Sequence, residues 1–163
     1  MSKEELLKAL LIKVVKVLVV LLALFLISAF INFLPFAGAL PFLSEKLPVS
    51  VFLNAVVSLF ALLAFAGFGS EVKTLLDRLL DRPAGTGELF LNIVRTLALL
   101  FAYYAFQEAV FPFIGDFEWV YQSLFLAVTM FFLAKIGLQV YGASEEISKF
   151  LLSLLDPYKK ILQ

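Results

Sequence analysis

The sequence predicts an all-α integral membrane protein with four transmembrane helices, arranged as a tandem repeat of two. Hydrophobic residues make up 63% of the chain and charged residues only 16%, which leaves too little polar surface for a soluble domain of this size. Apolar runs of about 20 residues recur, the length that a helix needs to cross ~30 Å of hydrocarbon. The residue-by-residue alternation of a membrane β-barrel is absent from these runs.

Breaks between the apolar runs divide the chain into the expected spans. Pro35, Pro41 and Pro48 predict an irregular, apolar loop after the first run, since proline disfavours a continuous helix. Arg82-Pro83 and a glycine-containing turn separate the second run from the third, and Pro112 and Gly115 separate the third from the fourth. The four expected spans are Val14–Leu34, Val49–Gly67, Leu89–Phe111 and Trp119–Tyr141.

A similar amphipathic segment follows each pair of runs. Glu71–Asp81 and Glu146–Asp156 align without a gap, with apolar residues at i, i+3, i+4, i+7 and i+8. Ser70 and Ser144 precede them as candidate N-caps. We therefore expect two repeats, 1–83 and 84–163, each ending in a cytoplasmic amphipathic helix. The apolar stripes could lie on the inner leaflet or pack together beneath the spans.

The distribution of charge predicts the orientation in the cell membrane. Lysine and arginine gather near the N-terminus, between the second and third spans, and near the C-terminus, whereas Lys46 is the only basic residue of the other two loops. Under the positive-inside rule, both termini are cytoplasmic.

Composition also excludes several kinds of chemistry. The chain has no cysteine and no histidine, so it lacks the usual protein ligands of zinc and haem and the usual acid–base catalyst. No glycine-rich phosphate loop, serine elbow or paired-carboxylate site occurs. We expect no enzyme activity, no cofactor and no metal site, and the net charge of zero gives no reason to expect nucleic acid as a partner.

Acidic residues gather on the expected outer side. Glu108, Asp116 and Glu118 could concentrate cations at a pore mouth if several copies surround one axis. They could equally be the hydrated ends of a loop. The second span has the fewest charges and many small residues, so Asn54 and Ser58 are the candidates for lining a path, although small residues also serve close helix packing.

Three cations stand towards the expected cytoplasmic ends of their spans: Lys16, Arg95 and Lys135. Long basic side chains at this depth can simply extend towards the headgroups. The functional alternatives are binding of anionic lipid headgroups or a cationic ring in an assembled pore.

Two stretches carry a resemblance to a known family. Leu59–Asp81 and Phe131–Asp156 each run from a small-residue membrane helix into an amphipathic helix. In this the chain resembles the conserved TM-helix repeat proteins related to the small-conductance mechanosensitive channel family, and Val14–Leu34 and Leu89–Phe111 fit the first helix of that repeat by pattern. The resemblance implies a homo-oligomeric, pore-type protein that responds to tension or lipids. The chain lacks that channel family's soluble β-domain, and its amphipathic segments are less basic.

Two functions from different classes follow from these observations. One is a homo-oligomeric ion channel or pore in the lipid bilayer, with a weak preference for cations. The other is a non-conducting membrane scaffold or a small subunit of a larger complex.

Overall fold

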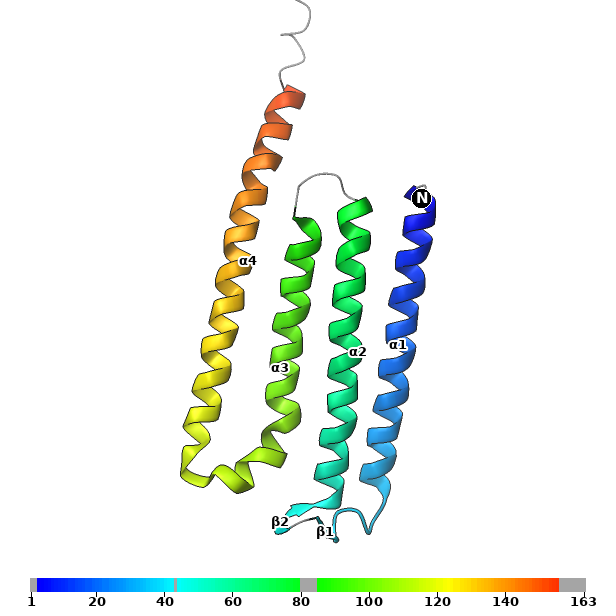
Figure 1. Cartoon of the computed structure of the whole chain (residues 1–163), viewed down its shortest axis with the longest axis vertical. Coiled ribbons are helices and arrows are strands. Elements are labelled where there is room, and N and C mark those ends of the chain that lie inside the picture. The colour runs from blue at the N-terminus through cyan, green and yellow to red at the C-terminus, as the bar shows by residue number, and fades with distance from the viewer. Residues whose placement is uncertain (1–2, 43, 80–84, 156–163) are drawn as a thin grey trace, which may run out of the picture.

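A computed structural model describes residues 3–42, 44–79 and 85–155, and nearly all of them are helical. The helices lie side by side in a single row, in chain order (Figure 1). Each helix packs mainly on its neighbours in the sequence. Helices α1 and α4 are the two outer members of the row, and the start of α1 and the end of α4 both lie along its upper edge in the view (Figure 1). The helices are α1 (Lys3–Phe33), α2 (Val49–Leu79), α3 (Thr86–Ile114) and α4 (Glu118–Leu155).

The connection between α1 and α2 packs against α2 and α3. Helix α1 ends at Phe33, shortly before Pro35, as the conformational restriction before proline favours. The connection contains a two-stranded antiparallel pair, β1 (Pro41–Phe42) and β2 (Ser44–Pro48). The first amides of α2 donate back into this connection, Val49 N–H to the Leu40 carbonyl at 2.9 Å and Ser50 N–H to the Ala37 carbonyl at 2.9 Å. The start of α2 is therefore capped by backbone carbonyls.

Helices α2 and α3 meet at two glycines. A Cβ on Gly69 would stand 2.7 Å from the Val94 side chain, and one on Gly87 would stand 2.5 Å from the backbone carbonyl oxygen of Lys73. Both spaces are too short for a methyl group. Glycine at these positions lets the two backbones approach closely, as small residues do between membrane helices.

A sharp bend joins α3 to α4. Pro112 stands inside the last turn of α3, and Gly115, at φ 49°, adopts a conformation that favours glycine. A short 3₁₀ helix, η1 (Gly115–Phe117), completes the bend. The Tyr121 hydroxyl then donates to the Tyr103 carbonyl oxygen at 2.9 Å and fastens the beginning of α4 to α3.

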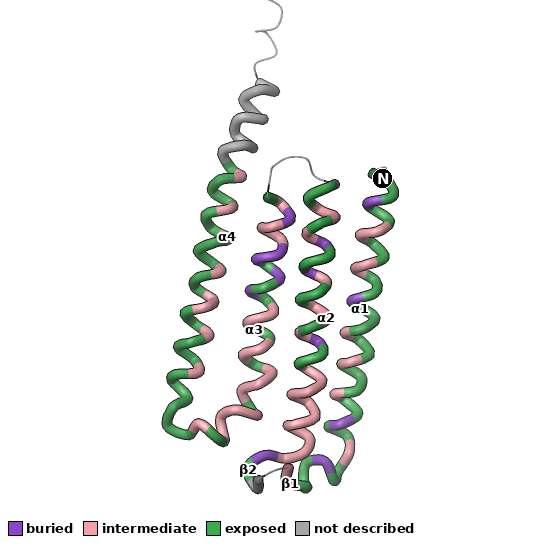
Figure 2. Tube along the Cα trace, viewed as in Figure 1, coloured by how far each residue is buried: buried purple, intermediate pink, exposed green. Residues whose placement is uncertain are grey.

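Few side chains are shielded by the protein itself. Buried positions gather near the start of α3 and along the part of α2 beside it, while most of α4 and α1 is exposed (Figure 2). A single row of helices has no interior between layers. The exposed apolar side chains are those that a bilayer would cover.

The expectation of four membrane spans in a tandem repeat is wrong. Among the described residues, three helical stretches are long and apolar enough to span a bilayer: Lys3–Phe33, Val49–Leu79 and Thr86–Ser144. The expected third and fourth spans are parts of the third stretch, since Pro112 does not end α3 and only η1 separates α3 from α4. The two halves also pack differently, because α2 has a helix on each side whereas α4 packs mainly on α3.

The separate amphipathic helices are also absent from the described residues. Helix α2 continues without a break to Leu79, and α4 continues to Leu155. Ser70 does not cap a new helix: its hydroxyl donates to the Ala66 carbonyl at 3.3 Å, and that of Ser144 donates to the Tyr141 carbonyl at 2.7 Å. Both are bonds to the preceding turn of a continuing helix. The ends of the two expected segments, and the expected unit boundary at 83/84, lie outside the described residues.

Candidate functional site

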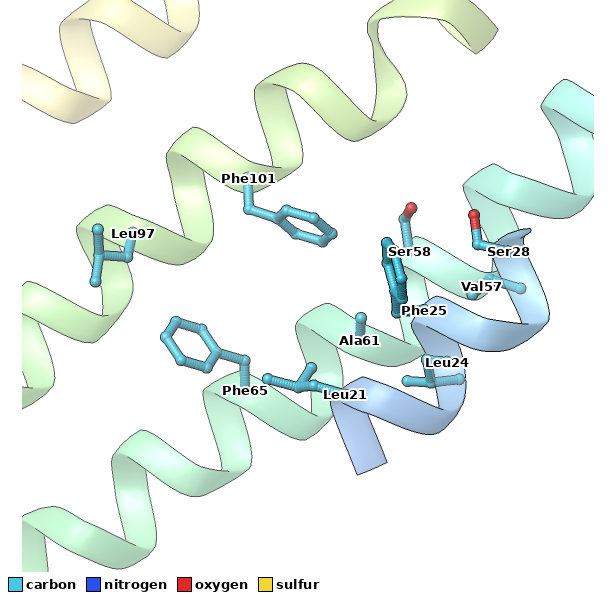
Figure 3. Close-up of a pocket in the computed structure, with 10 residues that line it drawn as sticks. All are labelled: Leu21, Leu24, Phe25, Ser28, Val57, Ser58, Ala61, Phe65, Leu97 and Phe101. Carbon is cyan, nitrogen blue, oxygen red and sulfur yellow. The ribbon is translucent and has the colours of Figure 1, made fainter. Parts of the chain in front are cut away.

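An apolar groove runs along one face of the row, between α1 and α3, with α2 as its floor. Its volume is about 480 Å³. The groove is bordered by Phe25 of α1, Phe65 of α2 and Phe101 of α3 (Figure 3). The small side chain of Ala61 on α2 leaves space between them. The groove has almost no charge or hydrogen-bonding capacity, so it suits a hydrocarbon chain or an apolar helix rather than a polar ligand.

The polar groups of the groove lie towards the end nearer the β1–β2 pair. Ser28 and Ser58 line the groove itself (Figure 3). The Ser28 hydroxyl donates to Asn54 Oδ1 at 2.8 Å, and Asn54 Nδ2 donates to Asn32 Oδ1 at 2.6 Å. These bonds join α1 to α2 and satisfy amide groups that would be costly to leave unpaired in hydrocarbon.

A second polar cluster lies at the start of α3 and contains the most deeply buried polar side chain. Asn92 is 0% exposed, and its amide nitrogen donates to Gln139 Oε1 of α4 at 3.0 Å. The Thr96 hydroxyl donates to the Asn92 carbonyl at 2.9 Å. Arg95 Nη1 approaches Asn92 Oδ1 at 3.4 Å. Asn92 therefore connects α3 to α4 and orients Arg95 at the same time.

Charged residues lie close to Asn92 at the start of α3. Lys73 of α2 forms an ion pair with Glu88 of α3 at 2.5 Å, and Arg95 stands 3.8 Å from the same carboxylate. Asp77 of α2 accepts the Gly87 N–H at 3.0 Å and so satisfies a free amide in the first turn of α3. Two carboxylates thus link α2 to α3: Glu88 through its ion pair with Lys73, and Asp77 through its hydrogen bond from the Gly87 amide.

The structure brings together some of the residues that the sequence singled out and separates others. Asn54 and Ser58 lie one turn apart on α2, beside and within the groove. Glu108, Asp116 and Glu118 are all exposed, at the end of α3, in η1 and at the start of α4. Arg95 and Lys135 both lie near Glu88. Lys16 lies apart from them on α1, near Glu71, which pairs with Lys13 at 2.6 Å.

The sequence reasoning missed Lys73, Glu88, Asn92 and Gln139. A spacing signal was present, because Glu88, Asn92 and Arg95 stand at i, i+4 and i+7 on one face of a helix, and Lys135 and Gln139 stand at i and i+4. Polar residues repeated in this way at the edge of an apolar run indicate a helix face that meets another polar face.

The described residues form no candidate metal site. In the ranges 3–42, 44–79 and 85–155, no group of three or more acidic side chains is placed to hold a metal ion. The fold, the exposed apolar surface and the three long apolar helical stretches indicate a helical membrane protein. No protein family, curated protein or solved structure matches the chain.

Proposed function

We propose that the protein acts as a homo-oligomeric pore of the cell membrane, with the groove face of α2 turned towards the axis of the assembly. The observation that carries the proposal is the single row of helices, which leaves the face bearing the groove without protein cover (Figure 1). One such row cannot enclose an aqueous path, whereas several rows around an axis can.

The groove face suits a gated path better than a permanently wet one. Asn54 and Ser58 supply polar groups on α2 towards one end of the groove, and Phe65 and Phe101 border the groove itself. Around an axis, these aromatic side chains would form a hydrophobic constriction, and such constrictions close by losing their water. A change in tension or lipid composition that separates the subunits would rewet it, in keeping with the resemblance to mechanosensitive channel relatives.

Ion preference follows from the acidic residues at the bend. Glu108, Asp116 and Glu118 are exposed near the turn between α3 and α4. Copies around one axis would raise the local cation concentration over about a Debye length, ~8–10 Å at physiological salt. The pore is therefore expected to prefer cations weakly, with the basic end of the bundle and both termini in the cytoplasm.

Mass and conductance together test the proposal. The protein purified in a mild neutral detergent should have the mass of several 18.2 kDa chains, and liposomes containing it should conduct when stretched. Ser58→Leu should reduce conductance by adding bulk to the groove floor, whereas Ser123→Leu, at an exposed position of α4, should not. Oligomers that never conduct under tension would contradict the pore.

One observation favours a second candidate, a non-conducting subunit or scaffold. Ser28, Asn32 and Asn54 bond to one another within the chain, which leaves less polar surface to line a path. In this case the groove would be covered by lipid or by another membrane protein. A monomer in detergent at all concentrations would favour this candidate and reject the first.

A further inference from the structure

Three cations from three helices converge on one carboxylate near the start of α3. Lys73 of α2 and Arg95 of α3 both approach Glu88, at 2.5 Å and 3.8 Å. Lys135 of α4 acts electrostatically on the same carboxylate, and Lys73 and Arg95 are near enough to repel each other. We call Lys73, Arg95 and Lys135 the basic cluster.

The described acidic side chains near the basic cluster do not neutralise all of its charge. Glu88 balances one of three positive charges, and Asp77, which also acts on Lys73, balances a second while its carboxylate accepts the Gly87 N–H. Among the described residues, at least one positive charge of the cluster is therefore left over. The side chains of Lys73, Glu88 and Arg95 are 36%, 35% and 46% exposed, so an anion can reach them from outside.

The donors of the basic cluster exceed the acceptors that the described residues supply. A lysine ammonium offers three N–H donors and an arginine guanidinium offers five. Lys73 has a short contact to Glu88, while Arg95 has only longer ones, at 3.8 Å to Glu88 and 3.4 Å to Asn92. An arginine with long contacts and an exposed face retains donors that fit a phosphate.

The base of the cluster is fixed rather than adaptable. Asn92 is fully buried and donates to Gln139 on α4, and its Oδ1 accepts the contact from Arg95. Gln139 is one turn from Lys135 on the same helix. Because the Asn92–Gln139 bond links α3 to α4 at this level, it also helps to set the spacing of Arg95 and Lys135.

The depth of the basic cluster matches the headgroup region of a bilayer. Lys73 follows the apolar part of α2 by about one turn, Arg95 lies near the start of the apolar part of α3, and Lys135 lies near the end of that of α4. The Lys135 ammonium lies 5.2 Å from the ring centroid of Phe131, so its stem runs along apolar surface. Side chains placed in this way present their charge at the boundary between hydrocarbon and water.

We propose that Lys73, Arg95 and Lys135 form a binding site for the phosphate of an anionic lipid headgroup. The ligand chemistry is a phosphate oxyanion with a net negative charge, held by the cluster while its acyl chains lie against α3 and α4. A free phosphate ion offers the same oxyanion from the aqueous side. The depth of the cluster and its apolar neighbours favour the lipid. The site does not depend on whether the protein conducts.

Lipid binding to the purified full-length protein tests this site. We would titrate short-chain phosphatidylglycerol into the protein in neutral detergent and follow the bound lipid by native mass spectrometry. We expect saturable binding that phosphatidylcholine does not reproduce and that millimolar inorganic phosphate does not displace. Lys135→Gln should weaken binding about fivefold, the usual effect of one basic residue at an anionic surface. Arg95→Gln should weaken it at least as much.

The matched control is Lys16→Gln, which removes a cation at the basic end of α1 and should leave binding unchanged. If Arg95→Gln does not fold, Lys135→Gln decides the question, because the structure gives this exposed side chain no ion pair shorter than 4 Å to another described residue. Equal binding of both lipids would overturn the proposal. So would equal losses in Lys16→Gln and Lys135→Gln, or complete displacement by inorganic phosphate, which would assign the cluster to a soluble anion.

Discussion

At the scale of single residues, Asn92 is the side chain on which the most depends. It is completely buried, and its two polar ends contact Gln139 and Arg95. Replacing Asn92 with leucine leaves the half-buried Gln139 carbonyl without its donor between α3 and α4. Such a loss costs about 1–3 kcal/mol.

We therefore predict that Asn92→Leu lowers the free energy of unfolding by about this amount, measured by thermal unfolding in detergent. The double variant Asn92→Leu with Gln139→Leu should be no less stable than the single one, because both partners are then apolar. Gln122→Leu, at an exposed position of the same helix as Gln139, should have little effect. Strictly additive losses in the double variant would show that the amide pair is not a unit.

The spacing of Glu88, Asn92 and Arg95 marks Asn92 as part of a polar helix face, but the sequence does not show that this side chain is buried or that it meets Gln139. Arg95 and Lys135 were singled out, since charge near hydrocarbon is conspicuous. Their common neighbour Glu88 and the third cation Lys73 come from elements whose angular positions the sequence does not define.

At the scale of elements, the contact between α2 and α3 has the tightest geometry. We predict that Gly69→Ala destabilises the protein, because the added methyl group would stand 2.7 Å from the Val94 side chain. Overpacking of this kind costs about 1–3 kcal/mol. At about 2–4 °C per kcal/mol, the unfolding temperature in detergent should fall measurably.

Gly67→Ala is the matched control, two residues away on the same helix. No atom lies within 4 Å of a Cβ built there, and alanine is favoured over glycine within a helix by about 1 kcal/mol. This variant should be as stable as the parent or slightly more so. Equal losses in both variants would mean that α2 and α3 do not pack closely at Gly69.

Helix lengths were harder to predict than helix positions. Hydrophobicity located the apolar parts of α1 and α2, and the prolines between them correctly predicted an interruption. Ser70 and Ser144 looked like helix starts because serine favours N-caps. In both cases the helix continues, and the serine hydroxyl donates to a backbone carbonyl of the preceding turn. Pro112 did not end its helix at once either, since α3 continues past it to Ile114.

At the scale of the whole molecule, the proposed orientation can be tested on the two ends of α1. The chain has no cysteine, so single cysteines can be introduced without altering any other residue. We predict that Lys8→Cys reacts with a membrane-impermeant maleimide only after permeabilisation. Gly38→Cys, in a connection where an added side chain meets nothing within 4 Å, should react in intact cells.

Neither substitution should disturb the fold. Lys8 loses only an exposed ion pair with Glu4, of a kind worth less than ~1 kcal/mol. The reverse labelling pattern would show that the protein has the opposite orientation in the membrane. Labelling of both positions from outside would mean that α1 does not cross the bilayer.

The row of helices also governs how the chain can fold. Each helix finds its main partner directly before or after it in the sequence, so no helix waits for a distant segment to be synthesised. Structures dominated by contacts between neighbouring segments form quickly, because little chain entropy is lost when they close. As α2 emerges it can pack on α1, α3 on α2, and α4 on α3. The protein is thus suited to assembly in step with its own translation.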